Sequence, residues 1–252
     1  MPATRSTRRV LFTLKLVMAP PMTEAFGTIT FLLSGVSSVV VKIPISLTPP
    51  VIPAASTTSP SPNGLKIMMS TNIKPISEFI ELHIGAGPGD AYPQGALDHL
   101  AENKTVTLEI GLGHAHLNSA SERPIVLMAG GTGFSYVKSI ADYLAETKPF
   151  HTVLLYWGAK NEESLYASEY LAEWANKFPH FQYIPVVEEA EDNWSGKVGY
   201  VHQAVMEDIV SLEPYDIYLA GPFKMAGIAR EDFINHKGAI KEHMFADAFA
   251  FI

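Results

Sequence analysis

The fold is decided by the stretch Pro124-Ile-Val-Leu-Met-Ala-Gly130-Gly131-Thr132-Gly133-Phe134-Ser135-Tyr136. Residues 125–129 have the length and apolar composition of a buried parallel strand. Beyond the glycines, apolar side chains recur at helical spacing, at Phe134, Val137, Ile140, Ala141 and Leu144. The stretch therefore predicts a strand, a glycine-rich turn and a helix.

The glycine-rich turn is a candidate binding loop for a dinucleotide. Gly130, Gly131 and Gly133 let the backbone turn sharply and approach a ligand closely. The start of the following helix offers unpaired N–H groups and the positive end of its dipole to a pyrophosphate. An ordinary tight connection between a strand and a helix uses the same glycines and is the alternative.

Composition and charge favour a small-molecule ligand. The chain has 252 residues, of which 47% are hydrophobic, enough for one large or two ordinary domains. A net charge of −8, with 18 Lys and Arg that form no stripe, argues against nucleic acid or an anionic membrane surface as partner. The absence of cysteine excludes disulfides, thiolate metal sites and a cysteine nucleophile. Any electron transfer must then use an organic cofactor.

Targeting signals are weak. No segment approaches the roughly 20 apolar residues that a membrane span needs. Arg5, Arg8 and Arg9 precede an apolar run as in a secretory signal, but Lys15 interrupts that run and no clear cleavage site follows. A soluble, cytoplasmic protein is the expectation.

The N-terminal part is atypical over residues 1–76. Residues 36–47 predict one or two strands, whereas the Pro, Ser and Thr of residues 48–63 predict an exposed loop. Further strands are predicted at 79–85 and 105–110, with a short helix at 96–101 between them. Short strands with long connections predict an antiparallel sheet or barrel. His114 and His116 have no third ligand nearby in sequence, so no metal site is expected.

The C-terminal part has the rhythm of alternating strands and helices, which predicts a doubly wound parallel sheet. The predicted strands lie at residues 125–129, 153–157, 183–187, 217–220 and 244–251.

Three further helices are predicted between these strands. The first begins at Asn161 as N-cap and buries an apolar stripe. The second carries Val201, Val205, Ile209 and Leu212, and the third opens after Gly221-Pro222, buries Ile228 among others, and stops at Gly238.

Ligands of such sheets bind outside the carboxyl ends of the strands. Three predicted strand ends carry suitable residues, namely 130–133, 158–160 and 221–223. Lys160 is placed to meet a phosphate or, alternatively, is a solvated loop charge. The convergence of three such ends supports a nucleotide site more strongly than any one of them.

Four segments in order give the chain a close resemblance to bacterial NAD(P)H-flavin reductases, within the ferredoxin-NADP reductase superfamily. The segments are Glu122 to Tyr136, Leu155-Tyr-Trp-Gly-Ala-Lys160 with Leu165-Tyr166, Asp216-Ile-Tyr-Leu-Ala-Gly-Pro-Phe-Lys-Met225, and Phe245-Ala-Asp-Ala-Phe-Ala-Phe-Ile252. The resemblance runs from about Phe79 to the last residue.

The resemblance implies two domains and a hydride transfer. An antiparallel barrel in residues 1–118 would hold the flavin, and an α/β domain in residues 119–252 would bind NAD(P)H. Hydride would pass to FMN, FAD or riboflavin, which in this family is often a released substrate. The reduced flavin would supply a flavin-dependent monooxygenase, luciferase-like chemistry or ferric iron.

The resemblance also assigns roles to single residues. Gly130, Gly131, Thr132 and Gly133 would hold the pyrophosphate, while Gly221, Pro222, Phe223 and Met225 would border the nicotinamide. Tyr92, Tyr136, Asp247 and Phe249 would lie around the flavin and the junction between the domains. Asp247 would be a catalytic acid or, alternatively, a solvated residue of the tail. Lys160 occupies a position where the family often has an arginine that favours a 2′-phosphate.

The N-terminal third departs from the family pattern. Family members carry an Arg-Pro-aromatic-Ser segment with the serine hydroxyl near the flavin, and the nearest equivalent is Ile43-Pro44-Ile45-Ser46. Ser46 is the candidate catalytic serine, although the arginine and the aromatic residue are absent. One hypothesis is that residues 1–76 derive partly from a shifted reading frame. The alternative function is then an impaired or non-catalytic nucleotide-binding protein with a degenerate flavin domain.

Overall fold

The computed structural model describes residues 115–252 throughout, together with parts of the preceding sequence. The earlier described residues are Gly95 and the strands β1 (Leu11–Phe12), β2 (Lys15–Leu16), β3 (Ile29–Leu32), β4 (Ser38–Pro44), β5 (Phe79–Gly85) and β6 (Thr107–Leu108). The chain divides into two compact units, of which the second includes residues 113–252. We call these unit 1 and unit 2.

The described strands of unit 1 form a mostly antiparallel arrangement. Strands β1, β3, β4 and β5 pair in that order, and each of these pairs is antiparallel. The strand predicted at 79–85 is confirmed as β5, and one strand, β4, covers most of the region where one or two were predicted. The predicted loop at 48–63 and helix at 96–101 lie outside the described residues, and so does the closure of a barrel.

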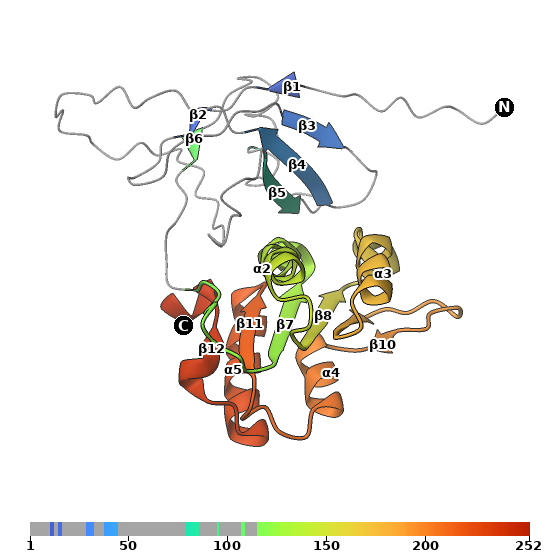
Figure 1. Ribbon diagram of the computed structural model, residues 1–252. Coiled ribbons are helices and arrows are strands. Elements are labelled where there is room, and N and C mark those ends of the chain that lie inside the picture. Colours follow the sequence, from blue (N-terminus) through green and yellow to red (C-terminus); the bar gives the residue numbers. More distant parts are fainter. Residues whose placement is uncertain are drawn as a thin grey trace. The chain divides into compact units, whose positions relative to one another are not determined.

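Unit 2 is the predicted parallel α/β sheet (Figure 1). Its strand order is β10-β9-β8-β7-β11-β12, and every neighbouring pair is parallel. The strands are β7 (Ile125–Gly130), β8 (Val153–Ala159), β9 (Phe181–Val187), β10 (Lys197–Val198), β11 (Asp216–Ala220) and β12 (Met244–Phe245). Strand β7 is central, and the chain runs to β8 on one side of it and later returns to β11 on the other.

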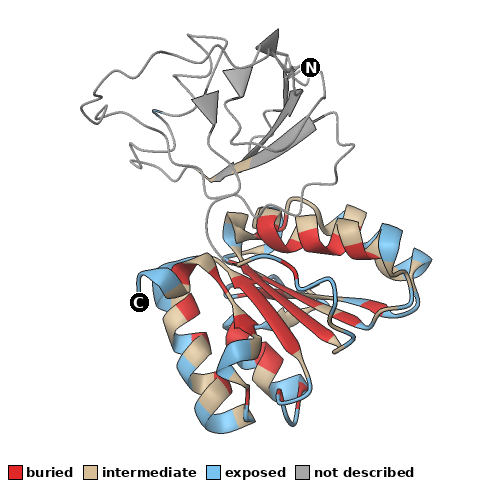
Figure 2. Ribbon diagram, turned by 60° about the vertical axis from the view of Figure 1, so that its left-hand side comes forward, coloured by how far each residue is buried: buried red, intermediate tan, exposed pale blue. Residues whose placement is uncertain are grey.

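Helices cover both faces of this sheet, as Figure 2 shows. They are α2 (Phe134–Thr147), α3 (Ser168–Lys177), α4 (Val201–Asp208) and α5 (Phe223–Lys237). Alternate β7 residues point to opposite faces: Leu127 packs in the core with α2, and Met128 packs in the core with α4 and α5. Both side chains are fully buried, so β7 is the interior strand that its apolar composition predicts.

The helix predicted from Asn161 begins later than expected. Asn161 does cap a helix, because its Oδ1 accepts a hydrogen bond from the Ser164 N–H at 3.2 Å, but that helix is the short 3₁₀ turn η2 (Glu162–Ser164). Leu165 then leaves the helical conformation and buries its side chain in the core with α2. Helix α3 therefore begins only at Ser168.

The strand predicted at 244–251 is wrong beyond its first two residues. Strand β12 ends at Phe245, and the 3₁₀ turn η4 (Asp247–Ala250) follows. The last pair joins Tyr218 to Phe245, although β11 continues to Ala220. The tail turns instead, because the Phe249 N–H donates to the Ala246 carbonyl at 3.1 Å and Ala248 becomes buried.

Two smaller predictions about the helices are also corrected. Helix α4 ends at Asp208, so Ile209 and Leu212 are buried beyond it rather than on it. Ile228, expected in the buried stripe of α5, is 40% exposed. The predicted stop of α5 is confirmed, since Gly238 ends the helix in the left-handed conformation, with a φ of 66°.

Candidate functional site

The strand order brings the three predicted strand ends together. Strands β8, β7 and β11 are neighbours, with Gly130 opposite Gly158 and Ala129 opposite Ala220. The loops that follow these strands therefore meet at one edge of the sheet, the carboxyl edge. The order of strands reverses between β7 and β11, and open α/β sheets bind ligands at such a reversal.

Gly133 brings the loop after β7 against the end of β11. A Cβ added at Gly133 would collide with the Ala220 carbonyl oxygen and lie 2.8 Å from the Gly221 nitrogen. Both obstacles are backbone atoms, which no side-chain rotation removes. Only glycine therefore fits where the two loops pack.

The loops after β7 and β11 also pack through Gly130 and Gly221. A Cβ at Gly130 would lie 2.6 Å from Met225 Sδ, and one at Gly221 would lie 3.1 Å from the Gly130 nitrogen. Gly221 has a φ of 152°, a conformation that side chains rarely adopt. The glycines thus have a packing role that the sequence alone did not separate from ligand binding.

Gly131 differs from its neighbours because space beside it is open. Its φ is 55°, and within the part of the chain that the structure describes no atom other than those of its chain neighbours lies within 4 Å of an added Cβ. The 3₁₀ turn η1 (Gly131–Gly133) leads directly into α2, and neither helix receives a side-chain cap. The start of the 14-residue α2 therefore offers its backbone N–H groups beside open space, as binding of an anion requires.

Trp157 fixes the position of this turn and was not among the predicted site residues. It is fully buried near the end of β8, and its Nε1–H donates a hydrogen bond to the Gly131 carbonyl at 2.9 Å. Its ring stacks on that of Phe134, the first residue of α2, with centroids 4.0 Å apart. The signal in the sequence was a tryptophan at the end of a strand adjacent to the loop.

Tyr136 and Asp247 form a second part of the candidate site. The Tyr136 hydroxyl is buried, and no hydrogen-bond partner for it lies among the described residues. Burial raises the pKa of Tyr136 well above its usual value, and the Asp247 carboxylate raises it further. Burial likewise raises the pKa of Asp247. The Tyr136 hydroxyl and the Asp247 carboxyl therefore lie near each other, and burial disfavours the charged form of both groups.

Replacing Tyr136 with phenylalanine is expected to leave the ligand-free protein as stable or to raise its free energy of unfolding by up to about 1 kcal/mol. The reason is that a buried hydroxyl without a partner costs its desolvation and gains no hydrogen bond. Urea denaturation of both proteins without ligand checks this. A loss above about 1 kcal/mol would mean that the hydroxyl has a partner in the free protein.

The C-terminal turn places further aromatic residues against α5. Phe249 packs under Arg230, whose guanidinium carbon lies 5.2 Å from the ring centroid. Phe223, the first residue of α5, is 53% exposed, and its ring centroid lies 5.7 Å from that of Phe251. Apolar rings are therefore exposed beside Gly221 and Pro222.

Lys160 lies at the end of β8, where the sequence placed it. Its side chain is 69% exposed, and its Nζ lies 3.4 Å from Glu189 Oε1. It is thus a solvent-facing charge with a partner. Ser46 and Tyr92 lie outside the described residues.

The described part of the chain has neither a metal-binding cluster nor a membrane-spanning helix. No group of three His, Cys, Asp or Glu residues there could hold a metal ion. No helix among these residues combines the length and the apolar character that crossing a membrane requires.

Comparison with known proteins points to one class of enzyme. A family model described as an oxidoreductase NAD-binding domain matches residues 127–231. The chain is 49% identical over 177 residues to an NAD(P)H-flavin reductase of Vibrio harveyi, covering 69% of this chain and 75% of the relative. It is 44% identical, with the same coverage, to an NAD(P)H-flavin reductase of Aliivibrio fischeri.

Solved structures resemble the chain in fold. An Amycolatopsis cytochrome P450 reductase has a TM-score of 0.65 at 21% identity, covering 95% of this chain and 70% of its own. The FAD/NAD-binding domain of a nitric oxide dioxygenase from Vibrio cholerae has a TM-score of 0.53 at 16% identity, covering 95% and 98%.

Proposed function

The chain belongs to the NAD(P)H-flavin reductases of the ferredoxin-NADP reductase family, and on that premise we propose that the carboxyl edge of unit 2 binds NAD(P)H for the reduction of flavin. The overall reaction is the family's: the chain is an oxidoreductase that uses NAD(P)H to reduce flavin. The residues that perform it are our proposal.

The observation that carries the proposal is the open, uncapped start of α2 beside Gly131. A pyrophosphate needs hydrogen-bond donors and positive potential, and the start of a helix supplies both. Gly131 leaves room for it, and Trp157 holds the turn in place through the Gly131 carbonyl. The residues present therefore fit the phosphates of the nucleotide, with Thr132 at the centre of the turn.

The nicotinamide half is assigned to the loop after β11. Gly221 and Pro222 present backbone without a large side chain, and the exposed ring of Phe223 follows them. Met225 lines the same loop from α5. A flat, largely apolar ring would lie there against a surface that excludes water, which hydride transfer requires.

When bound, the nicotinamide supplies the hydride and the flavin accepts it, so the protein contributes mainly position and exclusion of water. Tyr136, Asp247 and Phe249 are our candidates for the flavin side of unit 2. The Tyr136 hydroxyl supports this assignment, because it is a buried donor with no partner among the described residues and therefore fits a ligand acceptor. Asp247 is the proposed proton donor, since its raised pKa keeps a proton on it at higher pH than usual.

The raised pKa of Asp247 gives a testable pH dependence. In the window above the usual pKa of an aspartate, the folded state holds a proton that the unfolded state releases. The free energy of unfolding therefore falls as pH rises through this window. Asp247→Asn has no such carboxyl, so it should gain stability relative to wild type as pH rises and converge with it in acid.

Urea denaturation of wild type and Asp247→Asn over a pH series measures this difference. A pH-independent difference between the two proteins would show that the carboxyl is not desolvated. The pH profile of flavin reduction gives a second readout. If Asp247 donates a proton, the rate in wild type falls as pH rises through the pKa of Asp247, and this fall should be absent in Asp247→Asn.

The remaining assignments concern unit 1 and the acceptor. We place the flavin mainly in residues 1–118, with Ser46 and Tyr92 as candidates from the family resemblance. We also propose that free reduced flavin is delivered to a flavin-dependent monooxygenase or a luciferase. The nicotinamide nucleotides are intracellular reductants, which favours the cytoplasm as the compartment.

The test of the proposed function is a spectroscopic assay with the full chain. NADH or NADPH is mixed with free FMN, FAD or riboflavin, and the absorbance of the reduced nicotinamide is followed. We expect oxidation only when flavin is present. Binding of the nucleotide without turnover would instead favour the non-catalytic alternative, which no comparison supports.

A further inference from the structure

We propose that Tyr218 is a positioning residue for flavin reduction, because its buried hydroxyl fixes the segment through which the chain enters unit 2. This segment comprises residues 115–118, and we call it the entry segment. The inference rests on the proposed function and adds to it a residue that acts through its neighbours. It concerns the interior of unit 2, on the side of Tyr136 and Asp247.

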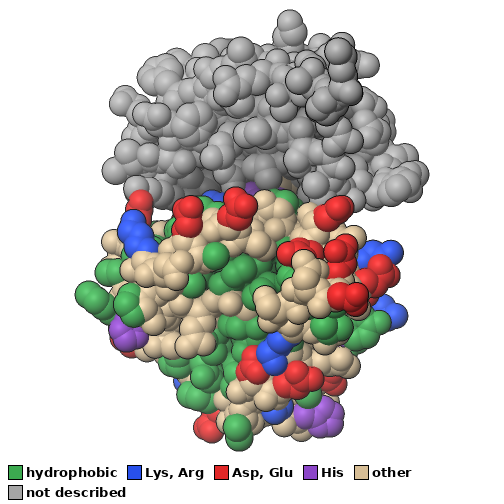
Figure 3. Space-filling view, turned by 90° about the vertical axis from the view of Figure 1, so that its right-hand side faces the viewer, with side chains coloured by type: hydrophobic (Ala, Val, Ile, Leu, Met, Phe, Trp, Pro, Cys, Tyr) green, Lys and Arg blue, Asp and Glu red, His purple; other side chains and the backbone are tan. Residues whose placement is uncertain are grey.

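Tyr218 carries a polar group in the middle of the sheet. On the face of unit 2 that Figure 3 shows, the charged side chains lie where water solvates them. Tyr218, in contrast, is fully buried on β11, opposite Leu127 of β7 and Phe245 of β12. Burial raises the pKa of Tyr218 to about 12, so the hydroxyl keeps its proton at neutral pH. A phenylalanine would fill nearly the same space without burying a polar atom, so the hydroxyl requires an explanation of its own.

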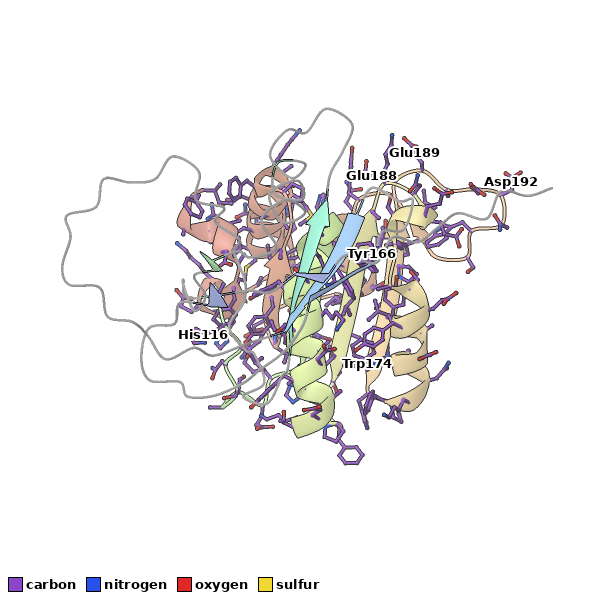
Figure 4. All side chains as sticks on the ribbon, turned by 90° about the horizontal axis from the view of Figure 1, so that it is seen from above. His116, Tyr166, Trp174, Glu188, Glu189 and Asp192 are labelled. Carbon is purple, nitrogen blue, oxygen red and sulfur yellow. The ribbon has the colours of Figure 1, made fainter. Side chains whose placement is uncertain are left out.

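The explanation is a hydrogen bond that the hydroxyl accepts from the entry segment. The Asn118 N–H donates to the Tyr218 hydroxyl oxygen at 3.0 Å, although the two residues are 100 positions apart. The preceding residue, Leu117, is buried in the same core as Tyr218, whereas His116 is exposed. Figure 4 shows His116 on the side of unit 2 that carries its faint red, C-terminal part. Two consecutive residues therefore hold the entry segment, one by an apolar side chain and one by its backbone N–H.

The same tyrosine supports the flavin side of the candidate site. Its ring stacks on that of Phe245, with centroids 4.7 Å apart and an angle of 13° between the planes, and Asp247 follows Phe245 by two residues. Burial raises the pKa of Tyr136, and so do Asp247 and then Tyr218, so the Tyr136 hydroxyl lies near both groups. The entry segment itself follows unit 1, whose last residue is Leu112. Tyr218 thus joins the segment that follows unit 1 to the residues proposed to meet the flavin.

A fixed entry segment matters because hydride transfer is sensitive to the placement of the two rings. A displacement of about 1 Å can lower the rate about 100-fold. The turn that binds the phosphates is held separately, by the hydrogen bond from Trp157 to the Gly131 carbonyl. Loss of the Tyr218 hydroxyl should therefore slow the transfer of hydride without weakening the binding of nucleotide.

The test is Tyr218→Phe in the full chain, which removes the hydroxyl and keeps the ring. Amide hydrogen exchange, followed by NMR, should become about tenfold faster at Asn118, because its N–H loses its acceptor. The rate constant of flavin reduction, measured in a single turnover with NADH and saturating FMN, should fall about tenfold. The Kd of NAD⁺, measured by isothermal titration calorimetry, should stay within about twofold of wild type.

Tyr156→Phe is the matched control. Tyr156 is also almost completely buried, and its hydroxyl donates a hydrogen bond to Asp208 Oδ2 at 3.1 Å. It lies on β8 and packs in the core with α4 and α5, on the opposite face of the sheet from the core of Tyr218. Removing this hydroxyl should lower the urea midpoint as Tyr218→Phe does. The rate of flavin reduction and the exchange at Asn118 should stay within about twofold of wild type.

Unchanged exchange at Asn118 in Tyr218→Phe would overturn the inference, and so would a wild-type rate of flavin reduction. An equal loss of rate in Tyr156→Phe would overturn it as well, because the effect would then follow from any buried hydroxyl. A loss of NAD⁺ affinity as large as the loss of rate would show that Tyr218 supports the whole unit and not the flavin side.

Wild-type protein that binds NAD⁺ and reduces no flavin would instead contradict the proposed function, a result that does not depend on the variants. Failure of the inference and failure of the proposed function are therefore distinguishable.

Discussion

Replacing Gly133 with alanine should lower kcat/KM for the reduced nicotinamide about 100-fold, which corresponds to about 2.7 kcal/mol of lost transition-state stabilisation. The added Cβ would overlap the backbone of Ala220 and Gly221. Relief requires that the loop after β7 move away from β11, which carries the start of α2 with it. The turn that binds the phosphates and the loop that binds the nicotinamide would then no longer be correctly placed relative to each other.

Stability should fall as well, by about 1–3 kcal/mol, because the site is overpacked. Gly227→Ala is the matched control, since an added Cβ there would make only an ordinary contact, 3.4 Å from Ile252 Cδ1. In the helix α5 it should be neutral or stabilising, by up to about 1 kcal/mol. Steady-state kinetics and urea denaturation of both variants measure the effects. Wild-type kcat/KM in Gly133→Ala would contradict the role given to this glycine.

Replacing Asp216 with alanine should lower the free energy of unfolding by about 2–3 kcal/mol. Its side chain is 1% exposed, and its Oδ1 lies 3.1 Å from Arg123 Nε and 2.6 Å from His243 Nδ1. Breaking a buried ion pair costs about 3–5 kcal/mol. We reduce that figure because Arg123 is 29% exposed and keeps its hydrogen bonds to the Glu213 and Tyr215 carbonyls.

This cluster joins β7, β11 and the segment before β12 at the amino edge of the sheet, opposite the proposed nucleotide site. Asp216→Ala should therefore change stability without changing the KM for nucleotide where the protein remains folded. Glu207→Gln, which removes an exposed partner of Lys197, is the control and should cost at most about 1 kcal/mol. Equal losses in the two variants would show that the buried cluster contributes no more than a surface pair.

The sequence predicted the sheet of unit 2 because its strands are short apolar runs separated by helices of clear periodicity. The predictions from the sequence were wrong where the same local pattern is compatible with two different structures. Asn161 looks like the cap of a long helix, yet burial of Leu165 ends the first turn. The alternating tail looked like a strand, but after Phe245 it turns into η4 and buries Ala246 and Ala248 in the core with α5.

The positions of the loops of the candidate site could be predicted from the sequence, but the residues that contact these loops could not. Three glycine-containing strand ends could be placed at one edge by the rules of parallel sheets. The hydrogen bond from Trp157 to Gly131 and the pairing of Lys160 with Glu189 join residues 26 and 29 positions apart. Such pairs depend on which strands are adjacent, which no local pattern contains. Ser46 and Tyr92 remain predictions from resemblance.

A crystal structure of the full chain with NAD⁺ tests the central claim most directly. We expect the pyrophosphate oxygens to accept hydrogen bonds from backbone N–H groups between Gly131 and Phe134, with the nicotinamide beside Gly221 and Pro222. A nucleotide bound with its pyrophosphate away from the start of α2 would contradict the account.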